Sequence, residues 1–318
     1  EKVLIDVVKE WKAAKGELSK LAILLRHPSQ SVLLENALLQ GGLAYTTRGL
    51  TSYVLQPEVL LVGGLLAVAT GQYAQLDAAA TREEMIRAVV FFCGVELGHE
   101  LSESESQEER LQNAIRHVLA QKESLAPFIE HQVLARAEPA LARRMRAAIA
   151  IASGPAGDAN WFQRSLEALQ IEAWVRQVFV SEQRRADALA YFEGLARVAA
   201  ASQGPEAFFE NLGRYENRSK RTTSPHKDAV RAARTRKETL TLSTIQDVKG
   251  LEFDHVVIPY LDEGAFPSPL AYSALEERNL FYVGITRARE ALTLIGSTEH
   301  PSPFLSVCGI TPGSSGST

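Results

Sequence analysis

The sequence predicts an α/β fold in which the two ends of the chain build one largely parallel sheet and a long helical insertion separates them. Short apolar or β-branched runs occur near both ends, at residues 21–25, 239–245, 255–259 and 291–295. Runs of this kind are typical of strands buried on both faces. From residue 72 to residue 236, apolar residues recur with a helical period instead. At 318 residues, the chain is long enough for two domains, each with its own core.

The first strand, Leu21–Leu25, is followed by a predicted helix. Ser29 or Ser31 can cap this helix, because a serine hydroxyl accepts a hydrogen bond from the free N–H groups of a first turn. The glycine pair at 41–42 marks its end. The most apolar stretch, Val59–Ala69, contains two glycines and is too short to span a bilayer, so it predicts a buried helix.

The central region predicts several helices and no strand. Apolar residues at helical spacing occur at 111–119, 166–178 and 189–198. Clusters that contain Gly and Pro, at 153–157 and 203–205, separate the helices. The acidic stretch Glu96–Glu109 predicts a solvated loop.

Two junctions near the C-terminal end carry side chains suited to binding a nucleotide. Gly250 and Glu252 follow a strand, where glycine lets a backbone approach a ligand closely and the carboxylate could accept hydrogen bonds from a ribose. The segment Phe281–Ile285 leads into a predicted helix start. Thr286–Ala288 would then lie at a strand-to-helix junction, a rigid mounting from which the Arg287 guanidinium can contact a phosphate.

These patterns divide the chain into three parts. Residues 1–71 and 237–308 are predicted to form the α/β domain, and residues 72–236 the inserted helical domain. Residues 309–318, which are rich in Gly and Ser, are predicted to be a flexible tail. No internal repeat of fixed period is visible.

Composition and charge exclude little by themselves. The formal net charge of −4 does not indicate a nucleic-acid binder. Residues 214–237 nevertheless hold nine Lys or Arg against two acidic residues, which predicts either a solvated linker face or a phosphate-contacting surface. Cys93 and Cys308 match no metal-ligand or disulfide spacing, and cysteine usage this sparse suggests a reducing compartment. No signal peptide is visible.

Two longer patterns lie in the last third of the chain. Thr244–Asp254 reads Thr-Ile-Gln-Asp-Val-Lys-Gly-Leu-Glu-Phe-Asp, and Glu276–Ala288 reads Glu-Glu-Arg-Asn-Leu-Phe-Tyr-Val-Gly-Ile-Thr-Arg-Ala. In order and spacing they resemble motifs V and VI of the UvrD/Rep-type superfamily 1 DNA helicases. Upstream, Leu21–Ser31 and Gly42–Tyr45 resemble the motif IV region of the same family. A match over this many positions is far more specific than a lone glycine pattern.

The resemblance implies one half of a two-domain motor. The two chain ends would form its second RecA-like domain (2A), of the P-loop NTPase type, and the helical insertion would be a 2B-like domain. The implied reaction is ATP hydrolysis coupled to 3′-to-5′ translocation on single-stranded DNA and duplex unwinding, as in DNA repair, replication and recombination. The implied partners are single-stranded or duplex DNA and an N-terminal RecA-like motor domain that carries Walker A and Walker B motifs. The resemblance implies a cytoplasmic location and no membrane partner.

ATP and Mg²⁺ are the cofactors that the resemblance implies. No Gly-x-x-x-x-Gly-Lys-Ser/Thr loop occurs in this chain. The run Val256–Glu263 ends in Asp-Glu like a Walker B strand, but it has no phosphate loop to work with. We therefore interpret Asp262–Gly264 as a turn after a core strand. The Mg²⁺ ligands are expected outside this chain, and the chain alone is expected not to hydrolyse ATP.

The implied nucleotide site follows from the motifs position by position. Arg287 matches the motif VI arginine that reaches the γ-phosphate and stabilises charge on the transferring phosphoryl group, so it is the implied catalytic residue. Gly250 and Glu252 match motif V and complete the implied ATP-binding set with Arg287. The alternative for Arg287 is a salt bridge at a helix N-terminus.

The implied DNA-binding residues are Arg26, Thr244, Gln246 and Ser268. Arg26 matches the motif IV arginine, and the family also grips single-stranded DNA with motif V. The family has histidine where this chain has Gln246 and Ser268, and Pro28 stands where the family has a polar residue. These departures leave the nucleotide half of the signature intact and weaken the case for DNA contact.

Two other classes of protein compete with a helicase half. A degenerate, non-enzymatic module for binding DNA or protein would explain the exchanged residues Gln246 and Ser268, but not the intact Glu252 and Arg287. A helicase–nuclease of the same superfamily fits less well, because the chain ends soon after its last predicted strand.

Overall fold

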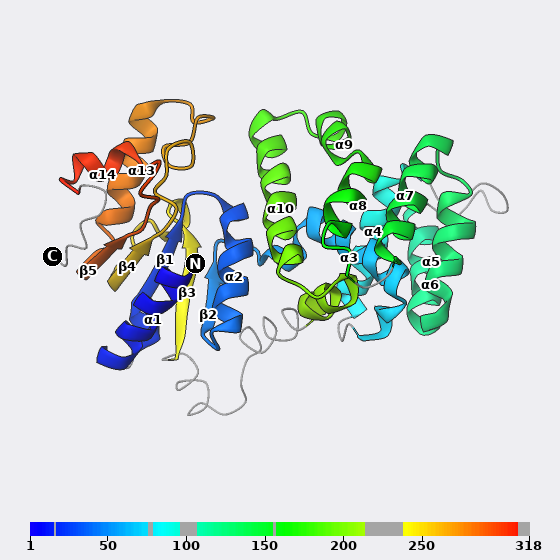
Figure 1. Cartoon of the computed structure of the whole chain (residues 1–318), viewed down its shortest axis with the longest axis horizontal. Coiled ribbons are helices and arrows are strands. Elements are labelled where there is room, and N and C mark those ends of the chain that lie inside the picture. Colours follow the sequence, from blue (N-terminus) through cyan, green and yellow to red (C-terminus); the bar gives the residue numbers. More distant parts are fainter. Residues whose placement is uncertain (16, 76–78, 96–106, 155–156, 214–237, 311–318) are drawn as a thin grey trace. The chain divides into compact units, whose positions relative to one another are not determined.

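The computed structural model describes residues 1–15, 17–75, 79–95, 107–154, 157–213 and 238–310 (Figure 1). Two compact units divide the chain. The first joins Glu1–Tyr53 with Ser219–Thr318, and the second is Val54–Arg218. Both chain ends thus belong to one unit, and the residues between them form the other.

The first unit contains a five-stranded sheet in which every strand pair is parallel. In the order β2-β3-β1-β4-β5, its strands are β2 (Ala44–Arg48), β3 (Thr239–Thr244), β1 (Leu21–Leu25), β4 (Phe253–Ile258) and β5 (Ala288–Leu294) (Figure 1). Strand β1 comes from the N-terminal end and lies between two strands of the C-terminal end, with Ile23 opposite Leu242 and Val257. The prediction that both ends build one parallel sheet is confirmed.

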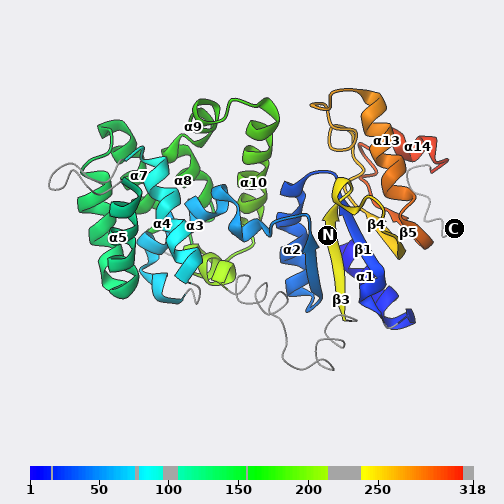
Figure 2. The same cartoon turned by 180° about the vertical axis from the view of Figure 1, so that it is seen from behind.

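Alternate residues of the strands pack into two cores, one on each face of the sheet. The odd-numbered residues of β1 pack against α1 (Lys2–Lys15) and α2 (Ser31–Gln40). The even-numbered residues face α13 (Ala274–Ile285) and α14 (Pro303–Val307) (Figure 2). Every residue of β1 is fully buried, and burying one aliphatic side chain of this size contributes about 1.5–3 kcal/mol. Burial on both faces explains why the run is apolar without interruption.

Short helical turns and one edge strand complete the first unit. The turns are η1 (Leu18–Lys20), η2 (Pro28–Gln30), η3 (Tyr53–Leu55) at the boundary, and η7 (Gln246–Val248). Helix α2 begins at Ser31, without a side-chain cap from Gln30, and ends at Gly41 as predicted. The sequence pattern does not predict β2, because its residues, Ala-Tyr-Thr-Thr-Arg, contain no apolar run and are half-buried or exposed at the edge of the sheet.

Helix α13 corrects one prediction. The segment Phe281–Ile285 does not lead into a helix; it forms the last turns of α13, which begins after Ser273. The Ser273 hydroxyl accepts a hydrogen bond from the backbone N–H of Glu276 at 3.1 Å. Glu276 and Glu277 lie in the first turn, where negative charge interacts favourably with the helix dipole. These start signals outweigh the strand-like character of the apolar end.

The second unit is helical throughout its described residues. It contains α3 (Pro57–Thr70), η4 (Gln72–Gln75), α4 (Ala79–Phe92), α5 (Gln107–Ala120), η5 (Lys122–Ser124), α6 (Leu125–Phe128), the π-helix η6 (Ile129–Leu134), α7 (Pro139–Ala152), α8 (Trp161–Leu169), α9 (Ile171–Val178) and α10 (Glu182–Ala200). Residues 205–213 are also helical. None of the helices in the described ranges has both the length and the hydropathy needed to cross a membrane.

Helix α3 shows why the stretch Val59–Ala69 is so apolar and where the first unit ends. The helix is buried from Glu58 to Ala67, and α4 packs closely against it. A Cβ on Gly64 would lie 2.7 Å from the carbonyl oxygen of Met85 in α4, so this close approach requires glycine. Because α3 packs with the helical unit, the boundary falls before Val54 and not after residue 71.

Several predictions lie outside the described residues. These are residues 96–106 of the acidic stretch, the second boundary at 236–237, the basic stretch 214–237, and residues 311–318 of the tail. Ile310 is described, and it packs against the core of the first unit instead of belonging to a free tail. Residues 107–109 begin α5, so the prediction of a loop is wrong for this part of the acidic stretch.

Candidate functional site

The predicted nucleotide and DNA residues fall at opposite edges of the sheet in the first unit. Arg26 directly follows β1 and Thr244 ends β3, so both lie at the edge formed by the carboxyl ends of the parallel strands. Gly250 and Glu252 shortly precede β4, and Arg287 directly precedes β5, so these three lie near the amino edge. Helix α13 runs between the two edges along one face of the sheet (Figure 1).

The Arg287 guanidinium is held mainly by backbone carbonyls. Its Nε donates to the carbonyl oxygen of Val283 at 3.0 Å, and its Nη1 donates to that of Leu251 at 3.1 Å. Its Nη2 donates to the Thr286 hydroxyl at 3.0 Å. The Arg287 carbonyl in turn accepts from the backbone N–H of Phe253 at 2.8 Å. A guanidinium carries five N–H donors, so two remain beyond these bonds.

The surroundings of Arg287 differ from the prediction. It lies at a helix-to-strand junction, between α13 and β5, so the prediction of a strand-to-helix junction is wrong. The alternative of a salt bridge at a helix N-terminus is also contradicted, because Arg287 follows a helix C-terminus. That end carries partial negative charge, which favours a nearby cation.

Glu252 and Gly250 lie next to Arg287 because Leu251, between them, accepts one of its hydrogen bonds. The Glu252 carboxylate accepts a hydrogen bond from Arg289 Nε at 2.8 Å, and both side chains are more than half exposed. This hydrogen bond and the charge of Glu252 raise the pKa of Arg289. Gly250 has a φ of +84°, and a Cβ there would meet nothing within 4 Å. Glycine is therefore needed for this backbone conformation, and the space beside it is open.

At the carboxyl edge, the segment that follows β3 packs against the turn after β2. Thr244 is buried, and its hydroxyl donates to the Asp247 carboxylate at 2.5 Å. Gln246 is exposed at the first position of η7. Gly49 has a φ of +63°, and any side chain there would clash with Asp247, so η7 packs directly on this turn.

Arg48 is an exposed cation at the same edge, and the sequence patterns do not single it out. It ends β2 opposite Ser243, whose hydroxyl donates to the Arg48 carbonyl oxygen at 2.8 Å. Its guanidinium has no ion-pair partner within the described residues. The sequence signal that could have predicted the position of Arg48 is the Tyr/Thr-rich stretch that ends in Arg-Gly. Tyr and Thr favour a strand, and the glycine after Arg48 favours a turn.

Arg26 and Ser268, two predicted DNA contacts, meet at one buried carboxylate. Arg26 Nε and Nη2 donate to Glu277 at 2.6–3.1 Å, and the two side chains are 13% and 3% exposed. The same carboxylate accepts from the backbone N–H of Ser268 at 2.8 Å, and Ser268 is itself buried. Motif resemblance does not assign a role to Glu277, and its burial is visible only in the folded domain.

Asp262 and Glu263 take part in a turn. The Asp262 carbonyl accepts from the backbone N–H groups of Ala265 and Phe266 at 3.0 Å, and its carboxylate accepts from that of Ser297. The interpretation of this segment as a turn after a core strand is confirmed. Among the residues that the structure describes, no group of three or more His, Cys, Asp or Glu could hold a metal ion.

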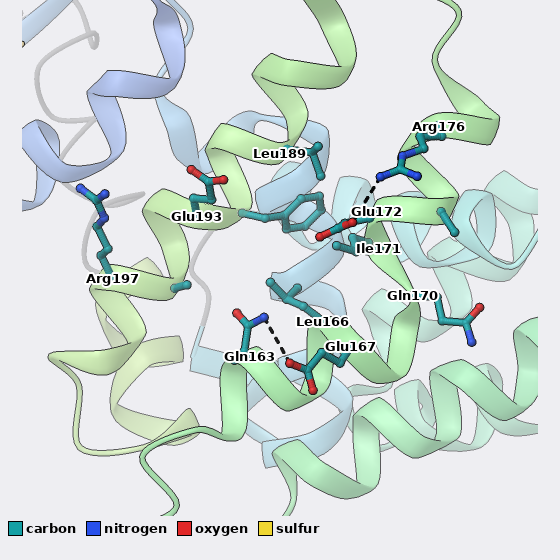
Figure 3. Close-up of a pocket in the computed structure, with 13 residues that line it drawn as sticks. Gln163, Leu166, Glu167, Gln170, Ile171, Glu172, Arg176, Leu189, Glu193 and Arg197 are labelled. Carbon is teal, nitrogen blue, oxygen red and sulfur yellow. Dashed lines mark hydrogen bonds and ion pairs between the residues drawn. The ribbon is translucent and has the colours of Figure 1, made fainter. Parts of the chain in front are cut away.

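The second unit contains an open groove of about 700 Å³ between α8, α9 and α10 (Figure 3). Its apolar lining includes Leu166, Ile171, Leu189 and Phe192. Glu172 and Arg176 form an exposed ion pair at 3.4 Å on its rim. None of the predicted site residues lines this groove, so it contributes nothing to the candidate site.

Comparison with known proteins identifies the segment that carries these motifs. Residues 220–299 match the UvrD-like helicase C-terminal domain. DNA helicase II of Escherichia coli K12 is 26% identical over 296 residues, which cover 92% of this chain and 39% of that protein. ATP-dependent DNA helicase PcrA of Bacillus subtilis 168 is 45% identical over 62 residues, 18% of this chain and 8% of that protein.

The extent of these matches decides what can be said of the chain. It spans about two fifths of the length of DNA helicase II, so the activity of that whole protein does not transfer with the match. The match nevertheless runs through nearly the whole chain, and the matched domain contains both Glu252 and Arg287. The chain therefore carries a UvrD-like helicase C-terminal domain, and its similarity to DNA helicase II and PcrA supports the C-terminal region of a UvrD/Rep-type superfamily 1 helicase.

Proposed function

We propose that this chain is the second motor domain, with its inserted helical domain, of an ATP-dependent DNA helicase. Its partner would be an N-terminal RecA-like motor domain that carries the Walker A and Walker B motifs. The observation that carries the proposal is Arg287, held beside Gly250 and Glu252 with two N–H donors to spare. The relatives are bacterial DNA helicases, which supports a cytoplasmic location as part of the same proposal.

The groups at the amino edge fit a nucleoside triphosphate. ATP, bound with Mg²⁺, would supply the phosphoryl group that is transferred to water. Arg287 would direct its remaining N–H donors at the γ-phosphate oxygens and stabilise the charge that develops there. Its bonds to the carbonyls of Val283 and Leu251 fix the guanidinium before the nucleotide arrives. The half-exposed carboxylate of Glu252 can accept a ribose hydroxyl, and we assign the Mg²⁺ ligands to the N-terminal domain.

For DNA we propose the carboxyl edge, with Arg48 and Gln246 in direct contact with the phosphate backbone. Both side chains are exposed there, and both donate hydrogen bonds of the kind that phosphate oxygens accept. Thr244, which bonds Asp247, would hold this edge in shape, as would Arg26 and Ser268 through Glu277. Translocation in the 3′-to-5′ direction and duplex unwinding are the expected outputs of the complete motor.

Steady-state ATPase kinetics with saturating single-stranded DNA test this function in a protein that contains both motor domains. Arg287→Ala should lower kcat on the order of 10²-fold, because its contact is made mostly in the transition state. Arg287→Lys should also be badly impaired, since lysine keeps the charge but lacks the planar fork. Arg197→Ala, which removes an exposed arginine from the groove of the second unit, is the control.

A wild-type kcat in Arg287→Ala would overturn the enzymatic proposal. A non-enzymatic module that binds DNA or protein would then describe the chain better. The exchange of the family's histidine for Gln246 is the observation in favour of that second function.

A further inference from the structure

We propose that Glu277 is a positioning residue that ties the carboxyl edge of the sheet to Arg287 through α13. The expected effect of Glu277 on catalysis rests on the proposed function. Its role in positioning α13 rests on the contacts within the first unit. Motif resemblance assigns no role to Glu277, and its neighbour Glu276 looks equivalent in sequence. In the fold, Glu276 is exposed while the Glu277 side chain is 3% exposed.

Both carboxylate oxygens of Glu277 are occupied from two separate segments. Oε1 accepts from Arg26 Nε at 3.0 Å and from its Nη2 at 2.6 Å. Oε2 accepts from Arg26 Nε at 3.1 Å and from the backbone N–H of Ser268 at 2.8 Å. A paired cation and satisfied oxygens offset the cost of burying this carboxylate, so these bonds favour one position for the first turn of α13.

The two segments that Glu277 holds are themselves fixed. The backbone N–H of Arg26 donates to Gln30 Oε1 at 3.0 Å, which anchors the end of β1 to η2. Two residues before Ser268, the ring of Phe266 packs against Phe281 and Phe304 with centroids 5.8 and 5.3 Å apart. The carboxylate therefore joins α13 to firm parts of the fold rather than to a loose loop.

The other end of α13 holds Arg287. The helix has 12 residues, so it is about 18 Å long and reaches from one edge of the sheet toward the other. In its last turn, the Gly284 carbonyl accepts from the Arg287 backbone N–H at 3.2 Å. A Cβ on Gly284 would lie 3.0 Å from Ile258 Cδ1, which shows how closely this turn packs on β4. Because α13 moves as one rigid helix, a shift of its first turn would also displace the Arg287 guanidinium.

Stability alone does not account for a buried ion pair at this position. Well-packed apolar residues of similar volume stabilise a fold as well as a buried pair does, or better. What a bidentate arginine–carboxylate pair adds is a defined direction and register between the elements it joins. The elements joined here are the strand edge with the proposed DNA contacts and the helix that carries the proposed arginine finger.

Hydrogen exchange on the 318-residue chain tests the structural part without any catalytic assumption. In Glu277→Gln, the peptide spanning residues 281–289 should exchange at least roughly tenfold faster than in wild type. Glu276→Gln makes the same change of charge in the same helical turn, and it should leave this peptide unchanged. Arg26→Lys keeps the positive charge but loses the planar guanidinium that contacts both oxygens of Glu277. It should increase the exchange rate of the same peptide by a smaller factor.

ATPase kinetics of the protein with both motor domains test the catalytic part. Glu277→Gln should lower kcat about tenfold with less than about a twofold change in nucleotide KM, because a displaced Arg287 stabilises the transition state less. Glu276→Gln should match wild type. A lower melting temperature with unchanged exchange at 281–289 and unchanged kcat would reduce Glu277 to a structural residue and overturn the proposal.

The two experiments separate this inference from the proposed function. If the wild-type motor does not hydrolyse ATP, the proposed function fails, while the exchange experiment still judges whether Glu277 positions the end of α13. If the motor is active and Glu277→Gln behaves like wild type in both assays, the positioning role fails and the proposed function stands.

Discussion

Two arginine–glutamate pairs in the first unit differ mainly in their burial. Arg26 and Glu277 have side chains 13% and 3% exposed, and three hydrogen bonds join them. Arg289 and Glu252 have side chains 60% and 51% exposed, and one hydrogen bond of 2.8 Å joins them. Both Arg26 and Glu252 lie in motifs that resemble those of the helicase family, so motif membership does not distinguish the pairs.

Burial decides what each pair can do. A charge whose partner is removed inside a protein is left without compensation, so a buried pair is held in one geometry. An exposed pair competes with water and salt, and its partners are released at little cost. The buried pair is therefore suited to shaping the site, and the exposed pair leaves Glu252 available to a ligand.

The largest expected effect follows from breaking the buried pair. Arg26→Ala should lower the free energy of unfolding of the first unit by about 3–5 kcal/mol, because Glu277 would remain buried as an unpaired charge. Native-state hydrogen exchange of the β1 amides measures this quantity for the first unit alone. Arg289→Ala is the matched control and should leave the same amides unchanged. Equal effects of the two variants would contradict the comparison.

The next effect concerns the exposed pair and nucleotide binding. Glu252→Gln should raise the nucleotide KM about tenfold while kcat changes by less than about threefold, because a positioning contact acts on the ground state and the transition state alike. The measurement is ATPase kinetics of a protein with both motor domains. A variant with unchanged KM and a greatly reduced kcat would show that Glu252 acts in the chemical step.

A smaller effect is expected for Arg48, an exposed arginine without an ion-pair partner in the described residues. Arg48→Ala should weaken single-stranded DNA binding at every sequence and reduce the slope of log affinity against log salt by about 0.7, as expected for one lost phosphate contact. DNA titrations at several salt concentrations measure it, with Arg197→Ala as the control. An unchanged slope would remove Arg48 from the DNA interface.

The smallest effect involves a buried titratable group that has no charged partner. His255 is buried, its Nε2 lies 2.8 Å from the Thr293 hydroxyl, and burial lowers its pKa. The unfolded chain then binds a proton more readily than the folded one, so stability falls as pH drops through about 6.5. His255→Gln should lose less stability than wild type between pH 7.5 and pH 5.5 in thermal melts. Parallel losses in the two proteins would refute this assignment.

Much of the sheet can be predicted from the sequence. Strands β1, β3 and β4 are largely buried between two layers of helices, so apolar and β-branched residues dominate them and they are easy to find. Strand β2 lies at the edge with half-buried residues, and its short Tyr/Thr stretch carries no such signal. Strand β5 is the other edge strand and its residues are half-buried or exposed, so the prediction of burial on both faces is wrong for this strand. Helix α3 is buried from Glu58 to Ala67, but an apolar pattern alone does not say which of the two units buries it.

The candidate site was partly predictable for a similar reason. Gly250, Glu252 and Arg287 lie in dense motifs with fixed spacing, and β4 pairs with β5 so that the three lie near one another. The sequence predicts a strand followed by a helix at Arg287, whereas the structure has a helix followed by a strand. The prediction is wrong because the apolar C-terminal end of α13 resembles a strand, and the helix start at Ser273 was not recognised. Arg48 lies in no motif, and only the sheet places it beside Ser243.

The sequence by itself determined the parallel α/β architecture, the helical insertion and the residues of the proposed nucleotide site. Only the tertiary structure decided which charged groups are available. Arg26 and Glu277 are 251 residues apart in the chain, so no local pattern predicts their contact. Glu276 and Glu277 are adjacent and chemically identical, and successive helical residues point about 100° apart around the axis. The packing of α13 on the sheet turns Glu277 inward to a buried arginine and leaves Glu276 in water.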